Sequence, residues 1–163
     1  MDETRRDLVG TCGFYCGSCA VHISYKKGIE YQRKLASALS THMGKPVAVT
    51  EIQCRGCRSL DRDSWGKRCT IRPCAEKKGI TYCHECPEFP CDQYITLSET
   101  YQGIPFTQLG ELKRFGVEKW LETMGGRWRC PKCTGAIESG TKKCGTCNSN
   151  CEKHVNSTLP PPG

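Results

Sequence analysis

Cysteine is the residue type in this chain with the most evident capacity for chemistry. The sequence holds 15 cysteines among 163 residues, a fraction at which cysteine acts as a scaffold rather than as a packing residue. Cys130 and Cys133 form one C-x₂-C pair and Cys144 and Cys147 another, with ten residues between the pairs for a short hairpin turning at Gly140. We predict a structural zinc ribbon, because four protein thiolates complete a tetrahedral site and leave no position for a substrate. Iron in a rubredoxin-like arrangement is the alternative.

The other ten cysteines form a block in the first part of the chain. They are Cys12, Cys16, Cys19, Cys54, Cys57, Cys69, Cys74, Cys83, Cys86 and Cys91. Ten thiols suffice for two four-thiolate sites, and His22 and His84 as extra ligands would allow three. Spacing does not assign the cysteines to individual sites. Zn²⁺ and a [4Fe–4S] cluster both suit soft thiolate ligands, and the missing ferredoxin run C-x₂-C-x₂-C-x₃-C-P favours zinc modestly.

Three other interpretations of these residues carry less weight. Cys12, Cys16 and Cys19 match the C-x₃-C-x₂-C loop of radical S-adenosylmethionine enzymes, but the chain is too short for their barrel. Cys83 lies beside His84, yet residues adjacent in sequence seldom face each other as a nucleophile and its base. We find no acid–base constellation, so an enzyme is not favoured. A C-x₂-H pair at Cys151 and His154 is expected to be spare, although it could extend or replace the second cysteine pair.

Charge and the N-terminal sequence bear on partner and compartment. The odd cysteine count, the absence of an apolar run behind the first charged residues, and the absence of any membrane-length apolar stretch predict a cytoplasmic protein with reduced thiols. The formal charge is +7. Three four-thiolate sites holding divalent ions would each carry −2, which leaves about +1. Basic residues near the cysteines therefore serve to neutralise the sites more readily than to bind nucleic acid.

The sequence predicts a small metal-stabilised α+β fold. Glycines and apolar spacing indicate helices over residues 28–43, 71–78, 94–101, 106–115 and 117–124, the last stopped by Gly125 and Gly126, with a short extended piece at 46–49. We expect an irregular cysteine-rich metal-binding module with short helices (1–100), a helical connector (101–126), the zinc ribbon (127–152) and a disordered tail (153–163).

Several segments resemble a known family. Residues 12–19, 54–58, 69–75 and 78–91, together with 116–121 and 127–133, are similar to a cysteine-rich prokaryotic family of unknown function with a C-terminal zinc ribbon. These segments span most of the chain. The resemblance implies a bacterial or archaeal metal-binding protein and supplies no activity. Asn148 stands where a glycine often follows the second cysteine pair, and asparagine also tolerates left-handed backbone geometry.

Three functions remain open from the sequence. The first is a zinc-stabilised adaptor that docks onto a protein partner, which the closed ribbon favours. The second is an iron–sulfur redox protein or enzyme that uses the Cys12–Cys91 block. The third is nucleic-acid binding through cations and a stacking ring on the ribbon, where the candidate residues are Arg127, Trp128, Arg129, Lys132, Lys142 and Lys143. For Trp128 we prefer packing against the ribbon.

Overall fold

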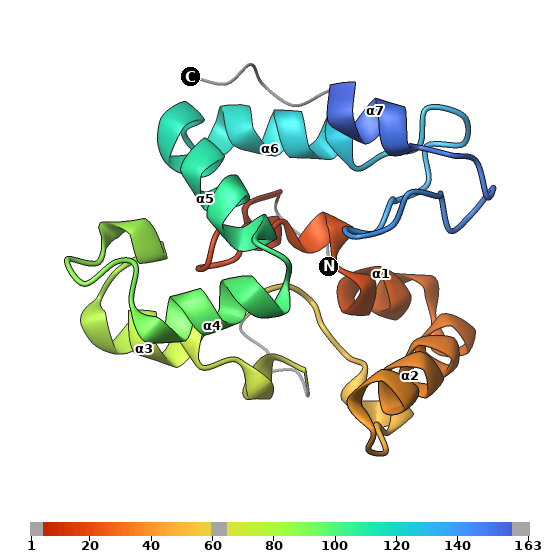
Figure 1. Cartoon of the computed structure of the whole chain (residues 1–163), viewed down its shortest axis with the longest axis horizontal. Coiled ribbons are helices and arrows are strands. Elements are labelled where there is room, and N and C mark those ends of the chain that lie inside the picture. The colour runs from red at the N-terminus through yellow and green to blue at the C-terminus, as the bar shows by residue number, and fades with distance from the viewer. Residues whose placement is uncertain (1–4, 60–64, 158–163) are drawn as a thin grey trace.

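Helices form most of the regular structure. The computed structural model describes residues 5–59 and 65–157, and this part of the chain contains seven α-helices (Figure 1). Their bounds are α1 Ala20–Lys27, α2 Ile29–Met43, α3 Ile71–Lys78, α4 Asp92–Thr100, α5 Ile104–Phe115, α6 Val117–Arg127 and α7 Glu152–Ser157. The 3₁₀ turns Cys16–Ser18, Val49–Glu51, Gly66–Arg68 and Cys83–Glu85 lie in or near the cysteine-bearing loops.

Glycine ends two helices where the sequence predicted. Gly44 follows α2 with φ 63°, and Gly79 follows α3 with φ 66°. Side chains are disfavoured in this left-handed region, so glycine at both positions lets the chain leave the helix. The helices predicted over residues 28–43 and 71–78 are thereby confirmed to within one residue. Helix α1 was not predicted, because its mixed polar and apolar residues give only a weak helical stripe.

Helix α6 extends past the predicted stop at Gly125 and Gly126. It continues to Arg127, and the N–H of Trp128 donates to the carbonyl of Met124 at 3.1 Å. The Arg127 guanidinium is 2% exposed and donates to both carboxylate oxygens of Glu111 in α5, at 3.0 and 3.2 Å. Burial of Arg127 and Trp128 against the core outweighs the roughly 1 kcal/mol that each helical glycine costs.

The predicted α+β class is wrong. Among the described residues there is no regular β-strand, only isolated antiparallel bridges at Val9–Tyr15, Arg129–Ala136 and Lys143–Asn150. The cysteine loops turn too tightly to extend a ladder beyond a single bridge. The extended piece expected at 46–49 leads into a 3₁₀ turn. Residues 153–157, expected in a disordered tail, lie in α7, while 158–163 lie outside the described residues.

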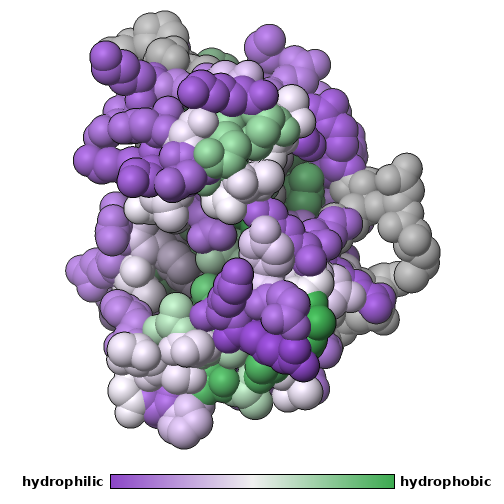
Figure 2. Space-filling view, turned by 90° about the vertical axis from the view of Figure 1, so that its right-hand side faces the viewer, coloured by the Kyte–Doolittle hydropathy of each residue, from purple (hydrophilic) through white to green (hydrophobic). Residues whose placement is uncertain are grey.

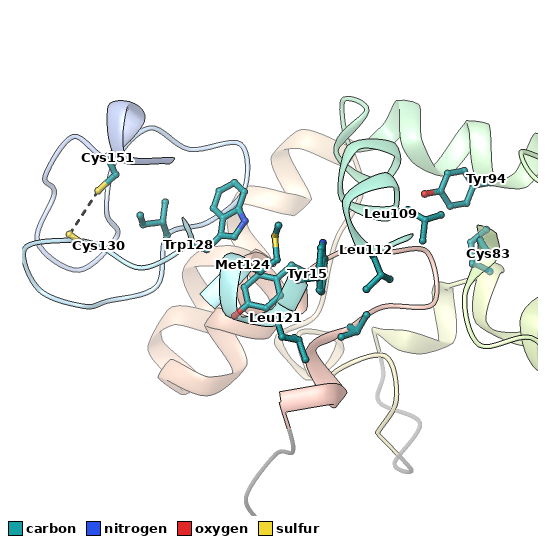
Figure 3. Close-up of a cluster of buried hydrophobic side chains, with 14 of the residues drawn as sticks. Tyr15, Cys83, Tyr94, Leu109, Leu112, Leu121, Met124, Trp128, Cys130 and Cys151 are labelled. Atoms are coloured by element: carbon teal, nitrogen blue, oxygen red, sulfur yellow. Dashed lines mark hydrogen bonds between the residues drawn. The ribbon is translucent and has the colours of Figure 1, made fainter. Parts of the chain in front are cut away.

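One hydrophobic core connects the C-terminal cysteines with the N-terminal block. Figure 3 shows its side chains in a row that runs from Cys130 through Trp128, Met124 and Leu112 to Cys83. Trp120 and Met124 are completely buried at its centre. A smaller cluster holds α1 and α2 together around Val21, Ala36, Val47 and Ile52. The predicted domain boundaries stay predictions, but the ribbon shares its core with the rest of the chain.

The surface is mostly polar on the face shown in Figure 2, with smaller hydrophobic areas between hydrophilic ones. In the described part of the chain, no helix is both long enough and apolar enough to cross a membrane.

Candidate metal centres

The two C-terminal cysteine pairs sit in loops with the same hydrogen bonds. In the first, the N–H of Cys130 donates to the carbonyl of Gly135 at 2.9 Å. In the second, the N–H of Cys144 donates to the carbonyl of Ser149, also at 2.9 Å. This repeat places two cysteine knuckles with matched geometry face to face. A turn at Gly140, with φ 87°, joins them as expected.

Backbone geometry lets the knuckles approach each other closely. Thr134 and Asn148, each directly after a second cysteine, both have φ 58°, so Asn148 adopts the left-handed geometry expected for that position. A Cβ atom at Gly135 would lie 2.7 Å from Thr146 Oγ1 in the opposite knuckle. A side chain at this position would crowd Thr146, so glycine favours the close approach of the two loops.

The sulfur atoms of the ribbon have the spacing of a single tetrahedral ion. Cys130, Cys133, Cys144 and Cys147 all have Sγ atoms within 4.8 Å of one another. The distances Cys130–Cys147 and Cys133–Cys144 are both 3.6 Å. Zinc–sulfur bonds of about 2.3 Å place sulfurs about 3.8 Å apart in a tetrahedron. The four cysteines can therefore hold one metal ion with little movement.

Hydrogen bonds to sulfur prepare these cysteines to act as thiolates. The backbone N–H groups of Cys133 and Lys132 lower the pKa of Cys130. Hydrogen bonds from the hydroxyl and N–H of Ser149 lower the pKa of Cys147 to about 6. Donors aimed at sulfur stabilise its negative charge at Cys130 and Cys147. At Cys133 the N–H of Gly135 acts in the same direction, but the Cys147 thiol and burial outweigh it and raise the pKa of Cys133 to about 12. Binding of a cation would release that thiol proton.

The two residues of the C-x₂-H pair, Cys151 and His154, lie at different places in the structure. Cys151 is 1% exposed and its Sγ lies 3.9 Å from that of Cys130, which places a fifth thiol against the ribbon (Figure 3). His154 Nε2 lies 3.2 Å from the carbonyl oxygen of Gly126, at the end of α6. The structure brings Cys151 to the ribbon, whereas His154 contacts α6.

The ten N-terminal cysteines separate into two groups, which spacing alone did not reveal. Six thiols line one cavity of about 240 Å³, together with the apolar side chains of Phe14, Trp65, Leu97 and Tyr101. These six are Cys12, Cys16, Cys19, Cys54, Cys57 and Cys69. We call this the six-thiol cavity. The other four, Cys74, Cys83, Cys86 and Cys91, line a separate hollow of about 20 Å³, which we call the four-thiol hollow.

Backbone N–H groups point at sulfur in the six-thiol cavity as they do in the ribbon. Cys16 accepts from the N–H of Cys57, and Cys19 accepts from those of Val21 and His22. The N–H of Thr11 lies 3.5 Å from Cys57 Sγ. Burial, followed by the charge of Cys57, still raises the pKa of Cys16 well above its usual value. A cation in the cavity would stabilise the thiolates, lower the pKa of the thiols and release their protons.

The spacing of the N-terminal thiols differs from that of the ribbon. All ten cysteines are described by the structure, and no three of their sulfurs lie within 4.8 Å of one another. One tetrahedral ion requires shorter separations. A polynuclear cluster sets its cysteine ligands farther apart, because metal atoms and inorganic sulfide occupy the centre. The N-terminal thiols are therefore not converged on one point as the ribbon thiols are, and only the six-thiol cavity encloses a volume of the size of a larger occupant.

Other candidate residues take structural positions. His22 is buried with Nδ1 3.0 Å from the carbonyl of Cys54, and the His84 ring stacks on Tyr82. Neither lines the cavity or the hollow. Trp128 is 8% exposed in the core, as preferred from the sequence, so its ring offers no open face for a base.

The basic residues suggested for nucleic acid are partly committed to other contacts. Arg127 is ion-paired with Glu111, and Lys142 lies 2.7 Å from Glu152. The residues that sequence reasoning missed are the cavity walls. Trp65 and Tyr101 lie outside every motif, and Phe14 lies between Cys12 and Cys16 without being a ligand type, so only the folded chain identifies these rings as walls beside the thiols.

Comparison with known proteins gives a family without an activity. No curated protein and no solved structure matches the chain. A family model described as "Protein of unknown function (DUF3795)" matches residues 8–96, which contain all ten cysteines of the N-terminal block. That match spans more than half of the sequence. The chain therefore belongs to the DUF3795 family of proteins of unknown function.

Proposed function

We propose that the protein is an electron-carrying iron–sulfur protein, with a [4Fe–4S] cluster in the six-thiol cavity and structural zinc in the ribbon. The observation that carries this proposal is the contrast in sulfur spacing. Six thiols surround about 240 Å³ of space without the close approach that a single ion needs. In the ribbon, four thiols converge within 4.8 Å and leave no open position.

Zinc in the ribbon contributes to folding rather than to reaction. Its four thiolates form a closed site, and binding of structural zinc supplies on the order of 10–16 kcal/mol at neutral pH. Cys130 and Cys144 are each 1% exposed and belong to the core, so metal binding also organises the packing around Trp128.

The six-thiol cavity suits a redox cofactor for two reasons. Aromatic and aliphatic walls lower the local polarity, and N–H donors on Cys16, Cys19 and Cys57 stabilise the anionic sulfurs. Both features set the reduction potential of a cluster. The cluster would accept one electron from a one-electron donor protein and pass it to an acceptor protein, with no covalent bond formed or broken.

Four thiolates ligate such a cluster, so the cavity contains two more thiols than it needs. Cys16 and Cys57 are neighbours in its lining, since the N–H of Cys57 donates to Cys16 Sγ. Replacement of one ligand could be rescued by a neighbouring thiol. The informative variant therefore changes both residues, as Cys16→Ser/Cys57→Ser.

The test is metal and sulfide analysis of anaerobically purified protein, with an absorption spectrum. The wild-type protein should be brown, with at least four iron and four sulfide per chain and one zinc. Cys16→Ser/Cys57→Ser should lose about four iron and keep zinc. The matched control, Cys133→Ser/Cys147→Ser, removes one ligand from each knuckle and should lose zinc but keep iron.

A colourless protein with zinc alone would overturn the proposal. That result would instead support the zinc-stabilised adaptor, whose test is recovery of a defined protein partner by the metal-replete chain. Retention of iron and sulfide by the Cys16→Ser/Cys57→Ser variant would contradict the assignment of the six-thiol cavity.

A further inference from the structure

We infer that a groove beside Tyr15 binds a small phosphate monoester that carries an apolar group. The groove consists of two adjoining spaces of about 330 and 450 Å³, volumes within the range of small-molecule sites. The first space lies between α1 and the ribbon, and the second lies along α6; Leu8, Tyr15 and Arg129 line both. No cysteine lines either space, and the structure describes every cysteine of the chain. The inference therefore does not depend on the proposed function.

The hydroxyl of Tyr15 is a polar group without a partner at the wall of this groove. Tyr15 is 8% exposed, and among the described residues nothing hydrogen-bonds to its hydroxyl. A Cβ atom on Gly17, which lines the first space, would lie 2.6 Å from the hydroxyl oxygen. The hydroxyl end of the ring therefore reaches the groove wall. Since a phenol in the protein interior normally finds a partner, this one is available to a ligand.

Tyr15 is held in one position by the core behind it. Its N–H donates to Oε1 of buried Gln108 at 2.8 Å. Its ring packs edge-on against Trp120, with 5.8 Å between the ring centroids. The hydroxyl is therefore positioned before a ligand arrives, which reduces the entropy cost of binding.

Two guanidinium groups act on this hydroxyl. Burial raises the pKa of Tyr15, and the positive charges of Arg129 and Arg5 oppose that rise. Arg129 lines both spaces, and Arg5 lines the second. The Nη1 group of Arg129 donates to the carbonyl of Thr134 at 3.3 Å, which ties this side chain to the ribbon. A planar guanidinium beside a phenol donor matches the oxygens of a phosphate group.

The remaining charged residues of the lining add to this positive charge. Lys26 and Lys27 of α1 line the first space, and Lys27 Nζ lies 3.3 Å from Thr146 Oγ1 of the ribbon. Among the described lining residues the only carboxylate is that of Glu122, which lies 3.6 Å from Lys119 Nζ. The excess of positive charge favours a dianion, and a phosphate monoester carries nearly two negative charges at neutral pH.

Apolar side chains line the groove beside these cations. Leu8 borders both spaces, Ile23 borders the first, and Leu121 borders the second. An apolar group attached to the phosphate would cover these side chains and add hydrophobic free energy to the ionic contacts. Inorganic phosphate would leave them exposed to water and should therefore bind more weakly.

The experiment measures binding of phenyl phosphate and inorganic phosphate to the full metal-loaded chain by isothermal titration calorimetry at constant ionic strength. Phenyl phosphate should bind saturably at one site, and inorganic phosphate at least about threefold more weakly. Tyr15→Phe removes only the hydroxyl oxygen and keeps the ring contacts. Tyr15→Phe and Arg129→Gln should each weaken phenyl phosphate binding about tenfold or more, as expected for loss of a hydrogen bond to a charged group.

Lys143→Gln is the matched control for the change of charge. Lys143 is an exposed residue of the ribbon that lines neither space, so its replacement should change the affinity by less than about twofold. Unchanged zinc content and helical circular dichroism show that each variant is folded.

Three outcomes would overturn the inference. The first is the absence of saturable phenyl phosphate binding by the wild-type protein. The second is wild-type affinity in Tyr15→Phe, or an equal loss in Lys143→Gln and Arg129→Gln, since binding would then rest on general positive charge. The third is displacement of phenyl phosphate by a short single-stranded DNA that binds more tightly, which would assign the groove to nucleic acid. Iron content tests the proposed function separately, so the two failures are distinguishable.

Discussion

Gly135→Ala should weaken metal binding by the ribbon through steric contact alone. The new Cβ would lie 2.7 Å from Thr146 Oγ1, 3.1 Å from Thr146 Cβ and 3.3 Å from Cys133 Sγ. All three separations are shorter than ordinary van der Waals contact, so the knuckles must move apart. Overpacking of this kind costs about 1–3 kcal/mol. Since each 1.4 kcal/mol is tenfold, we expect zinc affinity to fall about 5- to 150-fold.

The assay is a competition titration of zinc against a coloured chelator at fixed pH. Gly126→Ala is the matched control, because a Cβ at Gly126 meets nothing within 4 Å and should leave affinity unchanged. Gly135→Ala/Thr146→Gly removes the opposing side chain and should recover most of the lost affinity relative to Thr146→Gly alone. Unchanged affinity in Gly135→Ala, or no recovery in the double variant, would refute the steric argument.

Two further predictions concern the cavity and the core. Gly56→Ala should cut iron in the six-thiol cavity by at least half, because Gly56 has φ 111° and its Cβ would meet the Asp7 carbonyl oxygen at 2.6 Å. Gly66→Ala, with open space in the same wall, should keep its iron. Glu111→Gln should lower the free energy of unfolding by about 3–5 kcal/mol in urea, since it breaks a buried ion pair. Glu152→Gln, at an exposed pair, should cost under about 1 kcal/mol, and equal losses would refute the difference.

The ribbon and several helices were predictable because their signals are local. A C-x₂-C pair specifies a knuckle through one tight turn, and glycine after α2 or α3 specifies where the helix ends. The predicted α+β class was wrong because cysteine loops do not extend into strands. Each cysteine loop forms one isolated β-bridge, and its remaining residues lie in the turn that brings the two cysteines together, so no ladder of further pairs can form. The extension of α6 likewise depends on burial of Arg127 against Glu111, a residue 16 positions away.

The division of the ten cysteines could not be predicted from their order. Cys69 and Cys74 are five positions apart, yet they line different spaces because α3 begins between them. Cys12 and Cys83 are far apart in sequence, yet one hydrogen bond from Cys83 to Thr11 joins their loops. The sequence preference for zinc in this block rested on a missing ferredoxin run. That spacing describes one loop topology, whereas here the thiols come from separate loops and a helix.

Two hydrogen bonds and a ring contact connect the ribbon to the six-thiol cavity, and under the proposed function they give the closed zinc site a part in electron transfer. The N–H and hydroxyl of Ser139 both donate to the carbonyl of Ser18, at 2.8 and 3.1 Å. Ser18 directly precedes Cys19, whose thiol lines the cavity. On the other side, the Tyr15 ring, one residue before Cys16, packs edge-on against Trp120 at 5.8 Å in the shared core. The loop that supplies Cys16 and Cys19 is therefore held from both sides by the C-terminal half.

Zinc, by fixing the ribbon, would hold that loop in one position during a change of cluster charge. Smaller rearrangement on electron transfer lowers its barrier, so the closed site would contribute to the chemistry of the open one without taking part in it.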